Sequence, residues 1–386
     1  MPALKRFAPR INAGATTTNL DKPEARNPAA AFSALLSIIA SMKLKRAVLL
    51  LLCGLVAGCG SRESQSAPKW TLTRDSEAVV PDAKLRSQIF KALDAAEKVH
   101  TDTFISHFQV RAATVVEVNG KEEVVLGGNT EYGRPEGIHG ETSLLNHVMV
   151  LYGSEATHHA VRFVAFYGQT CGGTGSCGDC RDYQIATTDY EHLLVACGQA
   201  SDHTVRVHRF MDQLVCERDF PVVDAAKLPL NPKQLTTLVK SAEDARSAGI
   251  TLFTPGHNTG AAGLSWSGKT YRAAGADDAA FHYRYPIGGL LQQAATESDY
   301  LMRAIVVAGE PGQWPAVSYR DRQYGYEVST FNHAEGKPPI LLILTDGQGK
   351  YKVTTFESAL PYAFSTAAFM PDALSAFLKS HPNAKP

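Results

Sequence analysis

The sequence has no excess of charge of either sign, since 38 lysine and arginine residues balance 38 aspartate and glutamate residues in a chain of 386. Proteins that bind DNA or long RNA use clustered cations to displace counterions from the phosphate backbone, so this balance argues against a nucleic-acid polymer as partner. Charged residues make up 20% and hydrophobic residues 44% of the chain, which is typical of a globular protein rather than a disordered one. These values favour a small molecule as the ligand.

Cysteines and long apolar runs are also scarce. Seven cysteines are too few for a disulfide scaffold, so any role that they share must be local, as a metal site, a redox pair or a single bridge. The apolar run at residues 47–55 is too short to span a membrane. It follows the basic segment 42–46 and precedes small residues that end at Cys59, which is the order of a secretory signal.

Residues 55–59, with the sequence Leu-Val-Ala-Gly-Cys, resemble a bacterial lipoprotein lipobox. The resemblance implies that Cys59 is acylated, and that the protein is a membrane-anchored lipoprotein facing the periplasm or the exterior of the cell envelope. An ordinary signal peptide in which Cys59 is incidental is the alternative. We expect residues 1–59 to be an upstream extension and a signal peptide, with Met42 as the true start because it begins a complete signal.

The rest of the chain is long enough for two domains of about 150 residues each. We expect a flexible tether at residues 60–80, where serines and charges are frequent, a first domain at residues 81–225 and a second at residues 226–386. Each domain begins with a helix predicted from apolar residues at helical spacing. Asp82 is the expected cap of the first helix, and Asn231, followed by proline, opens the second.

The segments that follow these two helices are similar in kind. Residues 108–128 predict two strands around an Asn-Gly turn, and residues 261–275 predict two strands around a Ser-Gly turn. A loop, a helix and an apolar strand come next, with the strands at residues 160–166 and 304–308. The internal repeat predicts two tandem copies of one α/β unit.

Residues suited to catalysis are concentrated in the first copy. Cys177 and Cys180 lie three residues apart at the expected start of a helix, where the helix dipole lowers the pKa of thiols. With His139 they offer three ligands for zinc and leave a fourth position open for water, as in catalytic zinc sites. Glu141, two residues after the histidine, is the candidate to take the proton of that water. A structural zinc site closed by Cys171 and a redox dithiol without metal are the alternatives.

The order His-x-Glu followed by Cys-x-x-Cys is the signature of zinc-dependent cytidine deaminases, and this part of the chain resembles that family. Residues 129–131 resemble the family's Asn-x-Glu segment, and residues 106–112 resemble its Ser-x-Phe-x-Val-Gly-Ala strand. The resemblance implies a three-layer α/β/α fold with a mixed sheet flanked by helices, present here in two tandem copies. It also implies zinc on the histidine and the two cysteines, with Glu141 as the catalytic residue.

The same resemblance implies roles for residues around the zinc site. Asn129 and Glu131 would hydrogen-bond the ribose hydroxyls, and Phe108 would lie against the nucleoside. Arg181 would donate to a ligand thiolate, with capping of a surface as the alternative. Arg111 stands where the family has a glycine, which allows a different substrate.

The second copy resembles the same fold without its chemistry. Residues 285–292 resemble the family's Tyr-Pro-x-Gly-x-Cys-Ala-Glu, with Leu290 in the place of a ligand and Gln292 in the place of the acid. Ala316 and Tyr319 stand in the places of the two cysteines of Cys-x-x-Cys. A catalytic domain followed by a metal-free copy resembles the large dimeric cytidine deaminases, which implies a homodimer.

The resemblance predicts hydrolytic deamination of cytidine or deoxycytidine to the corresponding uridine, with release of ammonia. Deamination of another amino-bearing heterocycle or secondary metabolite is the first alternative. A non-catalytic lipoprotein of the envelope that binds nucleosides is the second.

Two cysteines and several histidines lie outside these motifs. Cys197 and Cys216 are expected to be buried thiols, with a disulfide between them as the alternative. Four histidines are expected to have no catalytic role: His107, His147, His158 and His159.

Overall fold

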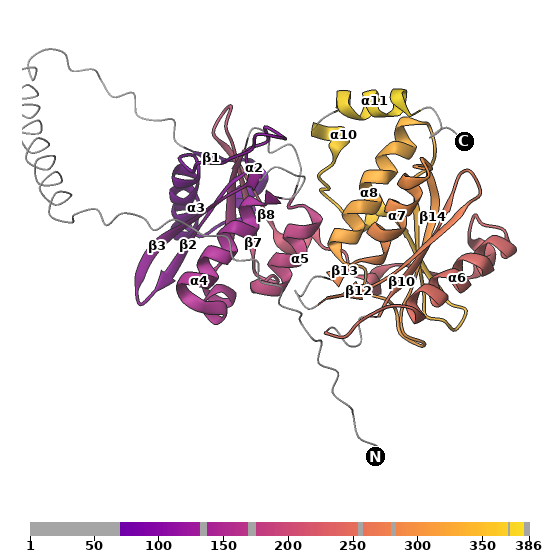
Figure 1. Cartoon of the computed structure of the whole chain (residues 1–386). Coiled ribbons are helices and arrows are strands. Elements are labelled where there is room, and N and C mark those ends of the chain that lie inside the picture. Colours follow the sequence, from indigo (N-terminus) through magenta and orange to yellow (C-terminus); the bar gives the residue numbers. More distant parts are fainter. Residues whose placement is uncertain are drawn as a thin grey trace, which may run out of the picture. The chain divides into compact units, whose positions relative to one another are not determined.

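The computed structural model of the chain describes residues 70–131, 137–168, 175–253, 258–278, 283–369 and 371–381. The expected signal peptide, Cys59 and Cys171 lie outside these residues. Two halves follow one another along the chain, and each contains a six-stranded sheet with helices packed on it (Figure 1). None of the described helices is both long and apolar enough to cross a membrane.

The first half forms a mixed sheet. Its elements are, in chain order, β1 (Thr71–Leu72), α2 (Arg74–Val79), α3 (Ala83–Ala96), β2 (Arg111–Val118), β3 (Lys121–Gly128), β4 (Thr130–Glu131), β5 (Gly137–Ile138), α4 (Gly140–Ala160), β6 (Phe163–Gly168), α5 (Gly178–Thr187), β7 (Leu194–Gln199), β8 (Thr204–Arg209), η1 (Phe210–Gln213) and η2 (Glu217–Asp219). The strand order is β1-β8-β7-β6-β2-β3. The pairs β6/β7 and β1/β8 are parallel, and the other neighbours are antiparallel.

The second half repeats this arrangement. Its elements are β9 (Val222–Val223), η3 (Ala225–Lys227), α6 (Pro232–Ser247), β10 (Gly260–Ser265), β11 (Thr270–Ala274), β12 (Ala276–Asp277), β13 (Tyr283–Arg284), α7 (Pro286–Thr296), β14 (Met302–Ala308), α8 (Tyr319–Ala334), β15 (Leu341–Thr345), β16 (Tyr351–Thr355), α9 (Phe356–Ala359), α10 (Thr366–Phe369) and α11 (Pro371–Ser380). The strand order is β9-β16-β15-β14-β10-β11, with β14 and β15 parallel. Five strands of this sheet therefore have counterparts in the first sheet. The edge strands differ, because β9 is antiparallel to β16 whereas β1 is parallel to β8.

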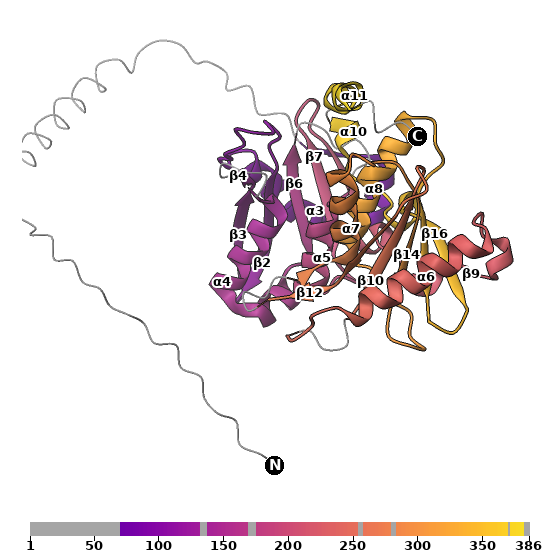
Figure 2. The ribbon, with the colours of Figure 1, turned by 45° about the vertical axis from the view of Figure 1, so that its right-hand side comes forward.

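Each sheet lies between two helical layers, because successive side chains of a strand face opposite sides of the sheet. Ala113 of β2 belongs to the core under α3, whereas its neighbour Ala112 belongs to the core under α4. In the second half Ala262 of β10 belongs to the core under α6, and Ala261 belongs to the core under α7. Figure 2 shows β10 and β14 between these two helices. The expected three-layer α/β/α fold in two tandem copies is confirmed.

The local signals in the sequence explain where these elements begin and turn. The Asp82 side chain accepts hydrogen bonds from two backbone amides of α3, at 2.7 and 3.3 Å. Asn231 accepts one from the first turn of α6 at 2.8 Å. In the first hairpin Asn119 and Gly120 adopt φ angles of 52° and 73°, as an Asn-Gly hairpin turn requires. Both predicted helix starts and both predicted hairpins are confirmed.

The flexible tether expected at residues 60–80 is wrong for its last part. β1 pairs with β8 at the edge of the first sheet, and α2 packs on β8. Trp70 is only 6% exposed, and its indole Nε1 donates to Asp94 at 2.6 Å. A buried indole with a partner for its N–H fixes this segment to α3, so the folded part includes Trp70. The second half likewise begins before residue 226, because β9 already pairs with β16.

Helices α5 and α8 pack against each other, and the hydrogen bonds between them are reciprocal. Asp182 of α5 accepts from the backbone amides of Tyr319 and Arg320, both at 2.9 Å. In return Gln323 of α8 accepts from the backbone amide of Gly178 at 3.3 Å. Each helix therefore binds the start of the other, which is the pattern of an interface around a two-fold axis.

Two buried arginines, Arg181 and Arg322, occupy equivalent places on these helices. Each Nε donates to the carbonyl oxygen five residues earlier, at 2.7 and 3.0 Å. Each guanidinium also reaches a carbonyl of the other half, Arg181 that of Pro361 at 2.7 Å and Arg322 that of Val215 at 2.5 Å. Both side chains are fully buried, so these hydrogen bonds replace water and tie the two halves together.

Candidate metal centre

The structure brings the three predicted ligands together at the starts of two helices. His139 is the N-cap of α4 and Cys177 is the N-cap of α5, with Cys180 in the first turn of α5. His139 Nδ1 lies 3.0 Å from Cys177 Sγ and 3.2 Å from Cys180 Sγ. The three ligand atoms lie within 4.8 Å of one another, and within the described residues this is the only such group of His, Cys, Asp or Glu side chains.

The chemistry of this donor set fits Zn²⁺. One imidazole nitrogen and two thiolates are ligands that zinc prefers. Three protein ligands leave one tetrahedral position for water or substrate, as in catalytic rather than structural zinc sites. Cys171, the alternative fourth ligand, lies outside the described residues.

The two cysteines differ in their readiness to ionise. A hydrogen bond with Cys180, together with the neighbouring His139, holds the pKa of Cys177 well below its usual range. The same hydrogen bond and burial raise the pKa of Cys180. The hydrogen bond to Cys177 and the charge of that thiolate raise the pKa of His139 to about 9. Cys177 is therefore poised as a thiolate, which is the form that binds a metal.

Glu141 lies in the first turn of α4, two residues after the histidine ligand, and is only 7% exposed. Burial, followed by the charge of Cys177, raises the pKa of its carboxyl group. A carboxyl group with a raised pKa can accept and return a proton near neutral pH. The position of Glu141 thus suits a proton carrier beside the three ligands.

Asn129 and Glu131 hold the backbone of the segment that carries Phe108. Asn129 Oδ1 accepts from the Val110 amide at 2.8 Å, and its Nδ2 donates to the Phe108 carbonyl at 2.7 Å. The Glu131 carboxylate accepts from the Ile105 amide at 2.6 Å and from the next amide at 3.1 Å. Hydrogen bonding of these side chains to a ribose stays a prediction.

The C-terminal segment of the second half reaches the first half close to these residues. Arg181 donates to the carbonyl oxygens of Pro361 and Tyr362, at 2.7 and 3.3 Å. The ring of Phe364 packs on the ring of Phe108, with the centroids 5.5 Å apart. The hydrogen bonds that the described residues give Arg181 all go to carbonyl oxygens, so the expected bond to a ligand thiolate is not observed. Burial lowers the pKa of Arg181 to about 10, which leaves it positively charged at neutral pH.

A cavity of about 380 Å³ lies beside His139 and is lined by both halves. The second half contributes Tyr285 and Arg320, and Arg320 forms an ion pair with Asp179 of the first half. Further polar side chains that the sequence did not single out line the first-half wall: Thr142, Asn146, Asp182 and Tyr183. No motif marks them, because they become neighbours only when α4, α5 and α8 pack together.

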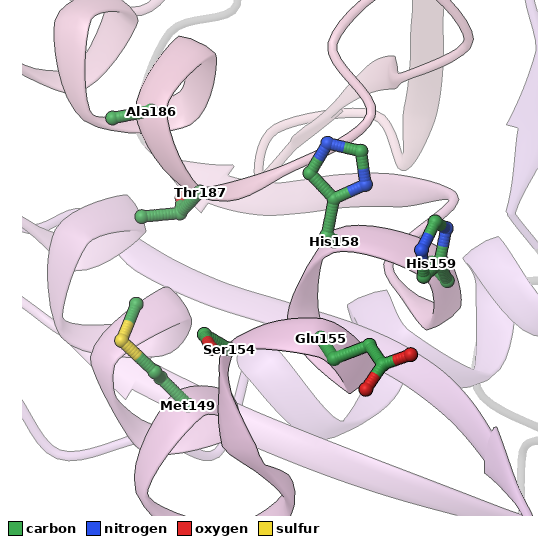
Figure 3. A pocket seen from close by; sticks show the side chains of 7 residues that line it. All are labelled: Met149, Ser154, Glu155, His158, His159, Ala186 and Thr187. Atoms are coloured by element: carbon green, nitrogen blue, oxygen red, sulfur yellow. The ribbon is translucent and has the colours of Figure 1, made fainter.

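A second cavity, of about 440 Å³, lies beside the bend in α4. The bend is at Gly153, where φ is 88° and ψ is 167°. Figure 3 shows His158 and His159 on the helical turn that follows, with Glu155 on the same segment. Across the described residues these histidines join no group of three metal-ligating side chains, and the cavity is lined by none of the predicted site residues.

In the second half the places of the three ligands are filled by other residues. Tyr285 is the N-cap of α7 as His139 is of α4, and Ser318 is the N-cap of α8 as Cys177 is of α5. The Ser318 hydroxyl accepts from the Asp321 amide at 3.0 Å, which repeats the contact between the two cysteines of α5. Asp321 therefore stands where Cys180 stands in the first half.

The Asp321 carboxylate closes the start of α7. It accepts from the backbone amides of Ile287 and Gly288, at 3.1 and 2.9 Å. The expectation that Ala316 and Tyr319 replace the cysteines is therefore wrong by two residues. The expected correspondences of Leu290 and Gln292 are wrong as well, because these two residues lie farther along α7, Leu290 in the core and Gln292 exposed.

The remaining cysteines differ from the expectation. Cys197 of β7 is disulfide-bonded, whereas Cys216 is free and exposed. A disulfide between the two is therefore wrong, and Cys216 is not a buried thiol. The partner of Cys197 lies outside the described residues.

Comparisons with known proteins show a partial likeness. No protein-family model matches the chain, and no curated protein matches it. The chain is similar to the solved structure of a cytidine deaminase from Burkholderia pseudomallei, at 26% identity and a TM-score of 0.30, over 33% of this chain and 98% of the other. It is also similar to cytidine deaminases from Mycobacterium tuberculosis (21% identity, TM-score 0.25, 34% of this chain and 95% of the other) and Mycobacterium leprae (18%, 0.25, 35% and 100%).

Proposed function

We propose that the protein is a zinc-dependent hydrolytic deaminase that acts on cytidine or deoxycytidine and releases ammonia. One observation carries the proposal: His139 Nδ1 and the sulfurs of Cys177 and Cys180 converge beside the buried carboxyl group of Glu141. Among the described residues no fourth protein ligand joins the set, which leaves one tetrahedral position open, and a site for hydrolysis requires such a position.

Each residue of the site has its own role in the proposed reaction. The three ligands hold the metal, and zinc bound there would supply a water that is ionised at neutral pH. Glu141 takes one proton from the attacking water and gives it to the ring nitrogen as the new C–O bond forms. It then takes the second proton, from the added hydroxyl group, and gives it to the amine, which leaves as ammonia when the C–N bond breaks. Phe108 contacts the flat face of the substrate. Arg181 keeps a positive charge close to the thiolates and balances part of their charge.

Deamination of another amino-bearing heterocycle is the second candidate. One observation favours it: the hydrogen bonds of Asn129 and Glu131 already go to the segment 105–110. These are the side chains that would otherwise bind a sugar.

We also propose that Cys59 carries a lipid, that the protein is anchored in the cell envelope, and that two chains form a homodimer. The disulfide at Cys197 fits an oxidising compartment outside the cytosol. The Cys59→Ala variant should leave the membrane fraction while the parent protein stays in it. Light scattering at several protein concentrations tests the dimer.

Ammonia release tests the function. The zinc-loaded full chain is incubated with cytidine, deoxycytidine, cytosine and other amino-bearing heterocycles, and ammonia is measured for each. The proposal expects release from cytidine that is lost in His139→Ala together with the zinc. Tight binding of cytidine without any turnover would contradict it and would favour a binding protein.

A further inference from the structure

The buried side chain of Gln213 binds the backbone just before the first cysteine ligand. Gln213 lies in η1, and its Oε1 accepts from the Ser176 amide at 2.9 Å. Ser176 is buried as well, so its N–H needs a protein acceptor. The zinc deaminase signature has proline at this place, which has no N–H, so the acceptor is a requirement of this chain. A Cβ at Gly175 would lie 2.1 Å from the same Oε1, so the chain passes very close to the amide.

The other end of the Gln213 amide is held by His208. The amide nitrogen can only donate, so Nε2 of His208 is the acceptor, and burial lowers the pKa of this histidine and keeps its ring neutral. The ring stacks on that of Tyr362 from the second half, with the centroids 5.5 Å apart. The Tyr362 carbonyl accepts from the Gly175 amide at 2.8 Å. The turn before Cys177 is therefore fixed from two sides.

Gln213 belongs to a layer of buried polar side chains behind α5. Gln184 Nε2 donates to Ser176 Oγ at 3.3 Å, while Gln184 Oε1 has no partner among the described residues. Polar groups in a protein interior lower stability unless they are hydrogen-bonded. Stability alone therefore does not explain this polar layer, which consists of Ser176, Gln184 and Gln213.

The second half has apolar groups at the equivalent places. The residue before the N-cap of α8 is Val317, where α5 has Ser176. The seventh residue after the N-cap is Gly325, where α5 has Gln184. A Cβ at Gly325 would lie 2.2 Å from the ring of Phe356, so this ring fills the space of the missing side chain.

Ala359 takes the place of Gln213 in the second half, because the two backbone carbonyls bind equivalent arginines. Arg181 donates to the Gln213 carbonyl at 2.6 Å. Arg322 donates to the Ala359 carbonyl at 3.1 Å. The same fold thus forms on an apolar core, and the polar layer occurs in the half that has the metal ligands.

The second half binds the matching N–H with a charged group instead. Glu217 Oε1 accepts from the Val317 amide at 2.9 Å, and the carboxylate also forms an ion pair with Arg322. In the first half the acceptor is the neutral amide of Gln213. The described residues give Arg181 hydrogen bonds to carbonyl oxygens and to no carboxylate, so its positive charge is not cancelled beside the cysteines.

We propose that Gln213 is a positioning residue for the metal centre, whose neutral amide holds the turn that carries Cys177 and Cys180. Cys177 is the N-cap of α5 and Cys180 lies in its first turn, so a shift of the chain before them moves both sulfurs away from His139 on α4. Groups that orient metal ligands without touching the metal are part of a metal site. This inference rests on the metal centre of the proposed function.

The test measures metal binding by the full chain in Gln213→Met, which keeps the length of the side chain and removes its amide. Co²⁺ is the probe, because it takes the same nitrogen and sulfur ligands as zinc and its visible absorption reports the thiolates bound to it. The affinity for Co²⁺ should fall by about 10- to 100-fold, with a changed absorption spectrum. Thr114→Val is the control. It loses a buried hydrogen bond to the Phe163 carbonyl in the same half, and it should leave both readouts unaltered.

Equal Co²⁺ affinity and equal spectra in the parent protein and Gln213→Met would overturn the inference, because the amide would then support the fold alone. A parent protein that binds no Co²⁺ would instead contradict the proposed function. Amide exchange still measures the hold on the turn in that case, and it should accelerate at residues 176–181 in Gln213→Met. Unchanged exchange there would contradict the role of Gln213.

His208→Phe provides a second variant if Gln213→Met does not fold. It keeps an aromatic ring beside Tyr362 and removes the acceptor of the Gln213 amide, so Co²⁺ affinity should fall by about threefold. In the Gln213→Met background the same change should have no further effect, because the two residues act through one contact. Unchanged affinity in His208→Phe alone would contradict the inference.

Discussion

The two halves of the molecule share a fold and differ in chemistry. Both have the same strand order, the same two helix starts in the centre and a buried arginine on the second of these helices. Where the first half has His139, Cys177 and Cys180, the second has Tyr285, Ser318 and Asp321; this difference changes three side chains and leaves the backbone frame in place. The comparison shows that the same scaffold forms with and without this set of three candidate metal ligands.

The comparison also shows which residue occupies the site of the metal ligands in the second half and what it binds. A helix start has free backbone amides that need acceptors. In α7 two of them are bound by the Asp321 carboxylate, which extends from α8. The buried acid of the second half therefore stabilises the start of a helix, whereas the buried Glu141 of the first half is the residue that we propose for proton transfer.

The largest effect is expected at Glu141. Replacing Glu141 by Gln removes the proton carrier but keeps the shape of the site, so kcat should fall by about 10³- to 10⁴-fold while zinc stays bound. Steady-state ammonia release and metal analysis on the same sample measure both. Gln292→Ala is the control and should have parental activity, because Gln292 is an exposed residue of α7. Parental activity in Glu141→Gln would show that Glu141 is not the proton carrier of the reaction.

The next largest effect concerns the buried arginines. Arg322→Ala removes a charged donor from three carbonyl oxygens and from the Glu217 carboxylate, so the free energy of unfolding should fall by about 3 kcal/mol. Arg181→Ala should cost a similar amount, and only this variant should also weaken zinc binding. Urea unfolding and zinc titration test the pair. A loss under about 1 kcal/mol for both would show that the reciprocal contacts do not hold the halves together.

A smaller effect is expected at the contact of α5 with α8. A Cβ at Gly178 would lie 2.1 Å from the Tyr319 carbonyl oxygen, so Gly178→Ala should force the two helices apart and cost about 2 kcal/mol. Gly168→Ala is the matched control, since a Cβ there meets its nearest atom at 3.7 Å. Thermal unfolding of the two variants compares them directly. Equal stability would show that the helices are not in close contact at this point.

The last prediction concerns the dependence of stability on pH. Burial raises the pKa of Asp321 to about 7, whereas an unfolded aspartate has a pKa of about 3.9. Between these values the folded state binds more protons than the unfolded state, so this group makes stability fall as the pH rises from about 4 to about 7 and adds no slope above that. Asp321→Asn should remove this slope. If the free energy of unfolding of Asp321→Asn depended on pH as that of the parent protein does, groups other than Asp321 would be responsible for the slope.

The sequence predicts the fold of each half well, because the signals are local. Helix caps such as Asp82, hairpin turns and strand alternation act over a few residues, and the internal repeat is visible from their order. His139, Cys177 and Cys180 could be found because a metal requires particular side chains at short spacings. Their convergence then follows from the packing of α4 against α5, because His139 and Cys177 are the N-caps of these helices.

Other features could not be predicted, because they depend on tertiary contacts. The segment at Trp70 looks like a linker in composition, and only the pocket that buries the indole makes it part of the fold. The register expected for α8 is wrong by two residues. The sequence around Arg320 matches the spacing of the motif, but the buried guanidinium is that of Arg322. Tyr285 likewise lines the cavity only because the two halves pack together.

Zinc stoichiometry tests the central claim most directly. Metal analysis of the full chain should give one zinc ion per chain. That ion should be lost in Cys180→Ser and retained in the matched Asp321→Ser of the second half. Two zinc ions per chain, or one that survives in Cys180→Ser, would contradict the assignment of the metal centre to the first half.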